Sequence, residues 1–165
     1  MEDKILADTA ILIGLQRGDE QVVKKFDQLK NRVVVSRITV CELIFGSRDQ
    51  QEKRINQEFL SYLDILEIDE RVSVLCYELM DKYGLKMRLG IADALIAATA
   101  VVHGLLLWTE NIKHFQMIKE VKLFKPKEVK YYDPWAFGIK KINEEASVSY
   151  RAGGEGAEES GRMRV

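Results

Sequence analysis

The sequence contains little proline or cysteine and no clear excess of charge of either sign. Two prolines in 165 residues, together with 47% hydrophobic residues, exclude a fibrous or disordered chain and predict a globular domain with a core of its own. The two cysteines, Cys41 and Cys76, form no Cys-x-x-Cys pair and have no metal-binding neighbours, so we expect reduced, buried thiols. Lysine and arginine number 25 against 26 acidic residues. A nucleic acid would therefore have to bind a local patch rather than a generally basic surface.

No uninterrupted apolar run is long enough to predict a membrane span. The longest apolar stretch, residues 91–108, is broken by Asp93, His103 and Gly104, which favours a buried helix followed by a strand. Asp8 interrupts the first apolar run of the chain, so no secretory signal is expected. We expect a cytoplasmic protein with no membrane partner.

Short apolar runs alternate with longer stretches of helical periodicity. The expected strands are 4–7, 32–36, 65–68, 105–108 and 121–124; the expected helices are 9–15, 19–29, 50–63, 69–83 and 112–118, with two more that carry Glu42 and Asp93. This alternation predicts an α/β fold with three layers, α/β/α, around a mainly parallel central sheet. Ligands of such sheets bind beyond the carboxyl ends of the strands.

Glycine and hydroxyl residues predict where several helices begin and end. We expect the first helix to stop at Gly14 or Gly18 and the helix that begins at residue 69 to stop at Gly84. Ser36 or Thr39 is expected to cap the helix that follows the second strand.

Three acidic residues lie in apolar surroundings on separate predicted elements. Asp8 follows the first strand, and Glu42 and Asp93 lie within apolar helices. Buried carboxylates are normally paired, hydrogen-bonded or bound to a metal. Oxygen ligands suit Mg²⁺ or Mn²⁺, and a site of this kind can activate water for phosphodiester cleavage.

Each acid also has a purely structural interpretation. Asp8 is suited to cap the helix that begins at Thr9. Glu42 is suited to pair with Arg37 or Arg88. Asp93 is suited to the first turn of its helix, where the helix dipole favours negative charge. The residues alone leave both interpretations open.

Four sequence stretches in order resemble the motifs of PIN-domain ribonucleases, especially toxins of the VapC type. They are Ala-Asp-Thr at 7–9, Val-Cys-Glu-Leu-Ile-Phe-Gly at 40–46, Ile-Ala-Asp-Ala-Leu-Ile-Ala-Ala at 91–98 and Trp-Thr-Glu-Asn-Ile-Lys-His-Phe at 108–115. The resemblance extends from about Lys4 to Asp133. It implies a PIN-like fold and a Mg²⁺-dependent endoribonuclease, usually a homodimer, that a small antitoxin protein holds inactive.

The resemblance also implies roles for individual residues. The metal-coordinating acids would be Asp8, Glu42 and Asp93, and the hydroxyls of Thr9 and Thr109 would orient water, metal-bound oxygens or RNA. Relatives often carry a fourth acid where this chain has Asn111. The amide oxygen of Asn111 is expected to serve as a ligand there, and the neighbouring Glu110 is the alternative. An acid is also common at the position of His114; a lone histidine suggests a surface or cap residue, so we leave it out of the predicted catalytic set.

Basic residues near the predicted site suggest where RNA would bind. Lys86 and Arg88 directly precede the helix of Asp93, so we expect them to hold a substrate phosphate. The lysine-rich stretch 113–130 is interpreted as a solvated surface.

The composition changes towards the C-terminus, where apolar residues become sparse and Gly, Glu, Ser and Arg dominate. We predict a nuclease domain over residues 1–135 and an extension over 136–165 that is flexible after about residue 143. The leading hypothesis for the chain is the toxin of a type II toxin–antitoxin pair. The alternatives are a catalytically weak or silent PIN-fold module that binds RNA or protein, and a nuclease of RNA maturation without an antitoxin.

Overall fold

Five short parallel strands form the central sheet of residues 4–125, the part of the chain that the computed structural model describes. They are β1 (Ile5–Ala7), β2 (Val33–Ser36), β3 (Asp64–Leu66), β4 (Leu106–Trp108) and β5 (Lys122–Leu123), and they lie side by side in the order β3-β2-β1-β4-β5. Each pairing between neighbours is parallel. The predicted parallel sheet is therefore confirmed.

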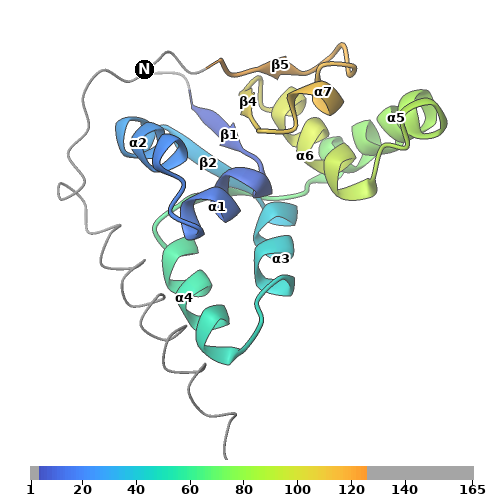
Figure 1. Cartoon of the computed structure of the whole chain (residues 1–165). Coiled ribbons are helices and arrows are strands. Elements are labelled where there is room, and N and C mark those ends of the chain that lie inside the picture. Colours follow the sequence, from blue (N-terminus) through green and yellow to red (C-terminus); the bar gives the residue numbers. More distant parts are fainter. Residues whose placement is uncertain (1–3, 126–165) are drawn as a thin grey trace, which may run out of the picture. The chain divides into compact units, whose positions relative to one another are not determined.

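Helices connect each strand to the next. They are α1 (Thr9–Gln16) and α2 (Glu20–Leu29) after β1, α3 (Arg37–Phe45) and α4 (Gln50–Leu60) after β2, α5 (Glu70–Met87) and α6 (Ile91–Val102) after β3, and α7 (Ile112–Phe115) after β4. Figure 1 shows α1 and α2 on one side of β1 and β2, and α5 and α6 on the other side of the sheet. The predicted three-layer α/β/α fold is confirmed.

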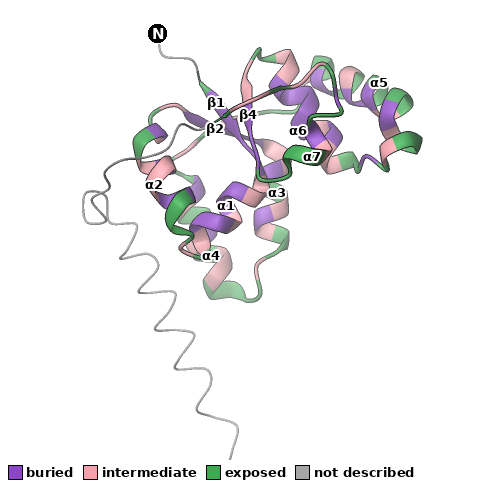
Figure 2. Ribbon diagram, turned by 45° about the horizontal axis from the view of Figure 1, so that its top comes forward, coloured by how far each residue is buried: buried purple, intermediate pink, exposed green. Residues whose placement is uncertain are grey.

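The core lies where helices cover the sheet. Leu6, Val34 and Leu107 of the three central strands are almost completely buried, as expected for parallel strands covered on both faces. Phe115 and Leu79 pack into the same cluster from the helices. Figure 2 shows this burial concentrated in β1, β2, β4 and the inward side of α6.

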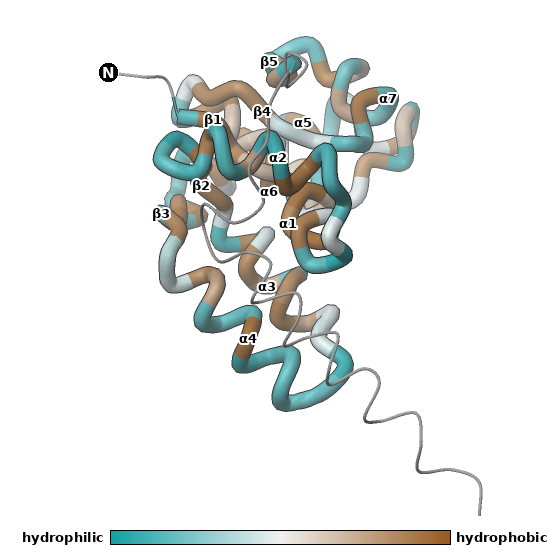
Figure 3. The backbone as a smooth tube through the Cα atoms, turned by 60° about the vertical axis from the view of Figure 1, so that its left-hand side comes forward, coloured by the Kyte–Doolittle hydropathy of each residue, from teal (hydrophilic) through white to brown (hydrophobic). Residues whose placement is uncertain are grey.

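Helix α4 differs from the helices around it because most of its surface is hydrophilic (Figure 3). Only Asn56 and Leu60 among its residues are buried. The Asn56 amide donates to the backbone carbonyl of Leu43 (3.3 Å) and to the hydroxyl of Ser47 (2.9 Å), and it accepts from Gln16. Polar contacts therefore fix α4 against α1 and α3.

Gly18, one of the two glycines predicted to end the first helix, follows directly after the cap of α1 and has a positive φ of 71°. The other candidate, Gly14, and Gly84, which was predicted to end the later helix, lie inside their helices. Helix α1 continues through Gly14 to Gln16, and a Cβ at Gly14 would lie 3.1 Å from a methyl group of Val22. Helix α5 continues through Gly84 and ends only at Arg88, which has a left-handed backbone (φ 52°). Glycine in a helix costs about 1 kcal/mol relative to alanine, and at Gly14 it allows Val22 of α2 to pack closely against α1.

No helix between residues 4 and 125 has the length and apolar character needed to cross a membrane. The domain boundary predicted at residue 135, and the extension predicted over 136–165, lie outside the described residues.

Candidate active site

Asp8 lies at the carboxyl end of β1 and joins this strand to β4. Its backbone N–H donates to the carbonyl of Trp108 (2.9 Å), and its carboxylate accepts from the Thr109 hydroxyl (2.6 Å) and the Thr9 backbone N–H (2.7 Å). Asp8 is the N-cap of α1 and only 5% exposed. Asp8 therefore has the capping role predicted for it. The same carboxylate also belongs to a group of buried and half-buried polar side chains.

Glu42 is connected to this group through the hydroxyl of Thr9. Helix α3 begins directly after β2 because the buried Ser36 caps it, accepting from the backbone N–H of Thr39 (3.2 Å). Glu42 lies in the second turn of that helix, where its Oε2 accepts from Thr9 Oγ1 at 2.6 Å. Strand β2 lies beside β1, the Ser36 cap starts α3 at the end of β2, and one and a half turns of α3 then bring Glu42 close to Asp8.

The ion pairs predicted as an alternative for Glu42 are wrong. Arg37 binds Glu67 instead, with Nε donating to the carboxylate at 2.9 Å. Arg88 is exposed beyond the end of α5 and forms no ion pair with Glu42 in the described part of the chain. Neither arginine therefore neutralises Glu42.

Asp93 lies in the first turn of α6, with its side chain 34% exposed. Its Oδ2 lies 3.3 Å from Nε2 of His114, but the two atoms do not have the geometry of a hydrogen bond. His114, predicted to be a surface or cap residue, lies in the last turn of α7 with its side chain 23% exposed. The signal in the sequence that could have indicated a place beside Asp93 was the position of His114 in the fourth motif, directly before the buried Phe115.

Thr109 and Asn111 follow β4 and contribute different groups. Thr109 is buried and donates its hydroxyl to Asp8, while the same oxygen accepts from the backbone N–H of Asn111 (3.0 Å). Asn111 itself is exposed. The contact of Asn111 with this group is thus made by its backbone, and the predicted role of its amide oxygen stays a prediction.

Burial destabilises the ionised forms of two of these acids, and repulsion by the other acids adds to the effect at Asp8. Burial raises the pKa of Asp8 above its ordinary value of 3.8, and the negative charges of Asp93 and Glu42 add to the rise, whereas the hydrogen bonds of Asp8 oppose it. Burial also raises the pKa of Asp93, with His114 acting in the opposite direction. Both effects on Asp8 would be relieved by a cation held among the three acids.

The donor atoms of this group match a hard divalent cation in type, because they are carboxylate and hydroxyl oxygens. Across residues 4–125, however, no three His, Cys, Asp or Glu side chains lie close enough together to hold a metal ion by themselves. Mg²⁺ is usually bound by one or two carboxylates together with waters and substrate phosphates. The residues therefore fit a cation that is completed by water or by RNA.

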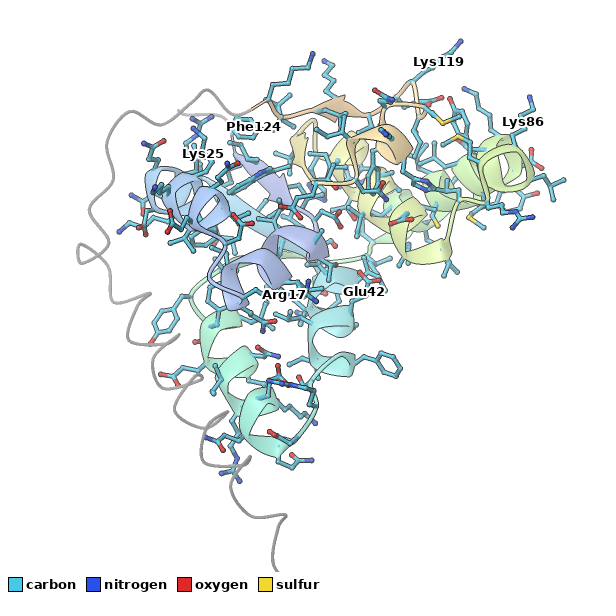
Figure 4. All side chains as sticks on the ribbon, viewed as in Figure 1. Arg17, Lys25, Glu42, Lys86, Lys119 and Phe124 are labelled. Atoms are coloured by element: carbon cyan, nitrogen blue, oxygen red, sulfur yellow. The ribbon has the colours of Figure 1, made fainter. Side chains whose placement is uncertain are left out.

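The two basic residues predicted to hold phosphate lie at the junction of α5 and α6. Lys86 is in the last turn of α5, Arg88 follows that helix, and both are exposed. Figure 4 shows Lys86 and Glu42 well apart from each other. A phosphate contact by Lys86 and Arg88 stays a prediction.

One further sequence expectation is corrected by the structure. Cys41, expected to be buried, is exposed on α3, whereas Cys76 is buried as expected. The apolar pattern around Cys41 did not predict its exposure. In a helix that is apolar almost all round, no polar residues mark the face that the rest of the protein leaves uncovered.

Comparisons with known proteins show the family to which the chain belongs. The family model of the PIN domain matches residues 5–120. Ribonuclease VapC1 of Methanocaldococcus jannaschii is 33% identical over 125 residues, which cover 74% of this chain and 86% of the relative. Among solved structures, a toxin–antitoxin complex from Klebsiella pneumoniae matches with a TM-score of 0.61 and 29% identity over 76% of this chain and 100% of its own. DNA-bound VapBC from Salmonella typhimurium matches with a TM-score of 0.65 and 25% identity over 74% and 97%. The resemblance inferred from the four motifs is confirmed, and the chain belongs to the PIN domain family.

Proposed function

We propose that this chain is a metal-dependent endoribonuclease that hydrolyses RNA phosphodiesters and acts as the toxin of a type II toxin–antitoxin pair. The observation that carries the proposal is the grouping of Asp8, Glu42 and Asp93 at one end of a parallel sheet, with Asp8 and Glu42 held by threonine hydroxyls. The names of the ribonuclease relative and of the toxin–antitoxin structures support the same activity.

The three acids would hold Mg²⁺, with Mn²⁺ as a substitute, and Asn111 would add an amide oxygen. When bound, such a cation lowers the pKa of a water molecule and offsets negative charge on the phosphodiester. Thr109 fixes the orientation of Asp8, and Thr9 fixes that of Glu42. Preset orientations of this kind reduce the reorganisation that the reaction requires. Lys86 and Arg88 are proposed to bind RNA phosphates.

The proposal is tested with purified protein and a mixture of transfer and ribosomal RNA. We expect cleavage with Mg²⁺ or Mn²⁺, none with EDTA, and a fall to the EDTA level in Asp8→Asn and Asp93→Asn. Asp81→Asn is the matched control, because Asp81 is exposed on α5, and it should cleave at the wild-type rate. Wild-type cleavage by a folded Asp93→Asn protein would overturn the proposal.

A second candidate is a PIN-fold module that binds RNA or protein without cleaving it. It is favoured by the absence of a closed group of three ligands within residues 4–125 and by the neutral, exposed Asn111. Calorimetric titration with Mg²⁺ and Mn²⁺ separates the two candidates. The nuclease must bind one of these cations in a way that Asp93→Asn weakens, whereas a silent module shows no such difference.

The proposed partners are a cognate antitoxin protein and a second copy of this chain. Exposed apolar side chains, including Phe45, Leu85 and Ile91, are available for such contacts. Light scattering of the purified chain tests the dimer. Co-purification of a small protein that abolishes cleavage tests the antitoxin and would exclude a nuclease of RNA maturation that works without one.

A further inference from the structure

His114 and Asp93 present a nitrogen and an oxygen to each other at a fixed short distance. Nε2 of His114 lies 3.3 Å from Oδ2 of Asp93. This nitrogen is almost completely enclosed and, within residues 4–125, has no hydrogen-bond partner. A buried polar atom without a hydrogen-bond partner normally costs about 1 to 3 kcal/mol, so a ligand shared by this nitrogen and the Asp93 carboxylate would offset that cost.

The imidazole of His114 is held in place by packing. It lies edge-on to the ring of Phe115, with 5.9 Å between the ring centroids and 84° between the planes. Phe115 is completely buried in the core, and only three residues separate the end of β4 from the start of α7. The nitrogen is therefore fixed relative to the end of the sheet, which carries Asp8 and Thr109.

The separation of the two atoms matches that of neighbouring ligands on one metal ion. With metal–ligand bonds of about 2.1 Å, adjacent ligands are about 3.0 Å apart in octahedral geometry and about 3.4 Å apart in tetrahedral geometry. The observed 3.3 Å falls within this range. An ion pair with good hydrogen-bond geometry would be shorter, at about 2.7–2.9 Å.

We propose that His114 supplies a nitrogen ligand, next to the carboxylate of Asp93, to the cation of the proposed nuclease site. This inference rests on the proposed function and adds a histidine to the acidic ligands Asp8, Glu42 and Asp93. Imidazole is a better ligand for first-row transition metals than for Mg²⁺, whereas carboxylates suit Mg²⁺ well. The site is therefore expected to prefer Co²⁺ over Mg²⁺ more strongly than a purely carboxylate site would.

The first test detects the nitrogen directly. The full-length protein is loaded with Mn²⁺, and pulsed electron paramagnetic resonance measures the coupling of a nitrogen nucleus to the metal. The chain contains two histidines, and His103 caps the opposite end of α6 and is exposed. We expect coupling in the wild type and in the control His103→Gln, and its loss in His114→Asp.

The second test measures selectivity by calorimetry with Co²⁺ and Mg²⁺ separately. In His114→Asp the ratio of Co²⁺ to Mg²⁺ affinity should fall about tenfold or more, on the scale of losing one supporting group at a metal site. His103→Gln should leave the ratio unchanged. An unchanged ratio in His114→Asp would overturn the proposal.

The wild-type spectrum keeps the proposal testable even if His114→Asp does not fold. Mn²⁺ bound without nitrogen coupling overturns the role of His114 and leaves the nuclease intact, provided that RNA is still cleaved. Nitrogen-coupled Mn²⁺ in a protein that cleaves no RNA supports the ligand and overturns the nuclease. A wild type that binds no cation overturns the role of His114 and the metal-dependent mechanism together.

Discussion

The hydroxyl of Thr109 donates a 2.6 Å hydrogen bond to the carboxylate of Asp8, joining the ends of β1 and β4 across 101 positions of sequence. Both residues are 5% exposed. A hydrogen bond to a charged acceptor in such surroundings is stronger than one at the surface. The contact therefore stabilises the fold and fixes an acid of the candidate site in the same orientation.

Replacing Thr109 by valine should reduce both stability and cleavage. The hydroxyl is lost while the volume is kept, so Asp8 loses a donor to its Oδ2. We expect the free energy of unfolding to fall by about 1 to 3 kcal/mol, measured by urea denaturation. Thr109→Ser should retain most of both properties. Thr99→Val is the matched control, because the Thr99 hydroxyl donates only to Leu95 O of its own helix, and it should leave cleavage unchanged. Full stability of Thr109→Val would contradict the prediction.

Asp8→Asn should make the protein more stable at neutral pH although it abolishes cleavage. The pKa of Asp8 is raised in the folded protein above its ordinary value of 3.8, so ionisation favours the unfolded state. The contribution of the Asp8 carboxyl to the free energy of unfolding is therefore fully present below about pH 3.8 and is lost as pH rises through the pKa of the folded protein. Asparagine does not ionise, so the variant does not lose this contribution at neutral pH.

Urea denaturation of wild type and Asp8→Asn between pH 4 and pH 8, without divalent cations, measures the effect. We expect the two curves to converge at the acidic end and to separate as pH rises, with the variant the more stable protein. If the free energies of unfolding of the two proteins differed by the same amount at every pH in this range, the charge of Asp8 would not be the cause of the difference.

Asn56→Ala should destabilise the protein by about 1 to 3 kcal/mol, because it removes the hydrogen bonds that this buried amide makes with Leu43, Ser47 and Gln16. Asn56 is 2% exposed, so water cannot replace the lost contacts freely. The exposed neighbour Gln57 provides the control, and Gln57→Ala should change the free energy of unfolding by less than about 0.5 kcal/mol. Equal effects of the two substitutions would refute the assigned role of Asn56.

Cys41 and Cys76 should react with a thiol reagent at clearly different rates. Cys41 is exposed, whereas Cys76 is 7% exposed and its burial raises the pKa of its thiol. Because the thiolate is the reactive form, Ellman's reagent should modify one thiol quickly in the native protein and the second only on unfolding. Cys41→Ser should remove the fast phase. Two fast thiols in the native wild type would contradict the burial of Cys76.

The sequence alone determined the layers of the fold and the elements that carry the acids. Strand and helix periodicities depend on neighbouring residues, so the positions of β1, β2 and α6 could be predicted within a few residues. Local capping was also predictable: Asp8 and Ser36 both cap the helices assigned to them, because a cap requires only a short polar side chain next to a helix start.

Tertiary structure alone decided which side chains meet. Gly14 remains helical because α2 packs closely against it, Arg37 faces Glu67 from the neighbouring strand end, and His114 lies beside Asp93 although 20 residues separate them. Such contacts depend on how the elements pack in three dimensions, which periodicity within one element does not encode. The acids could therefore be identified from the sequence, whereas the nitrogen beside them became visible only when the sheet had brought α6 and α7 together.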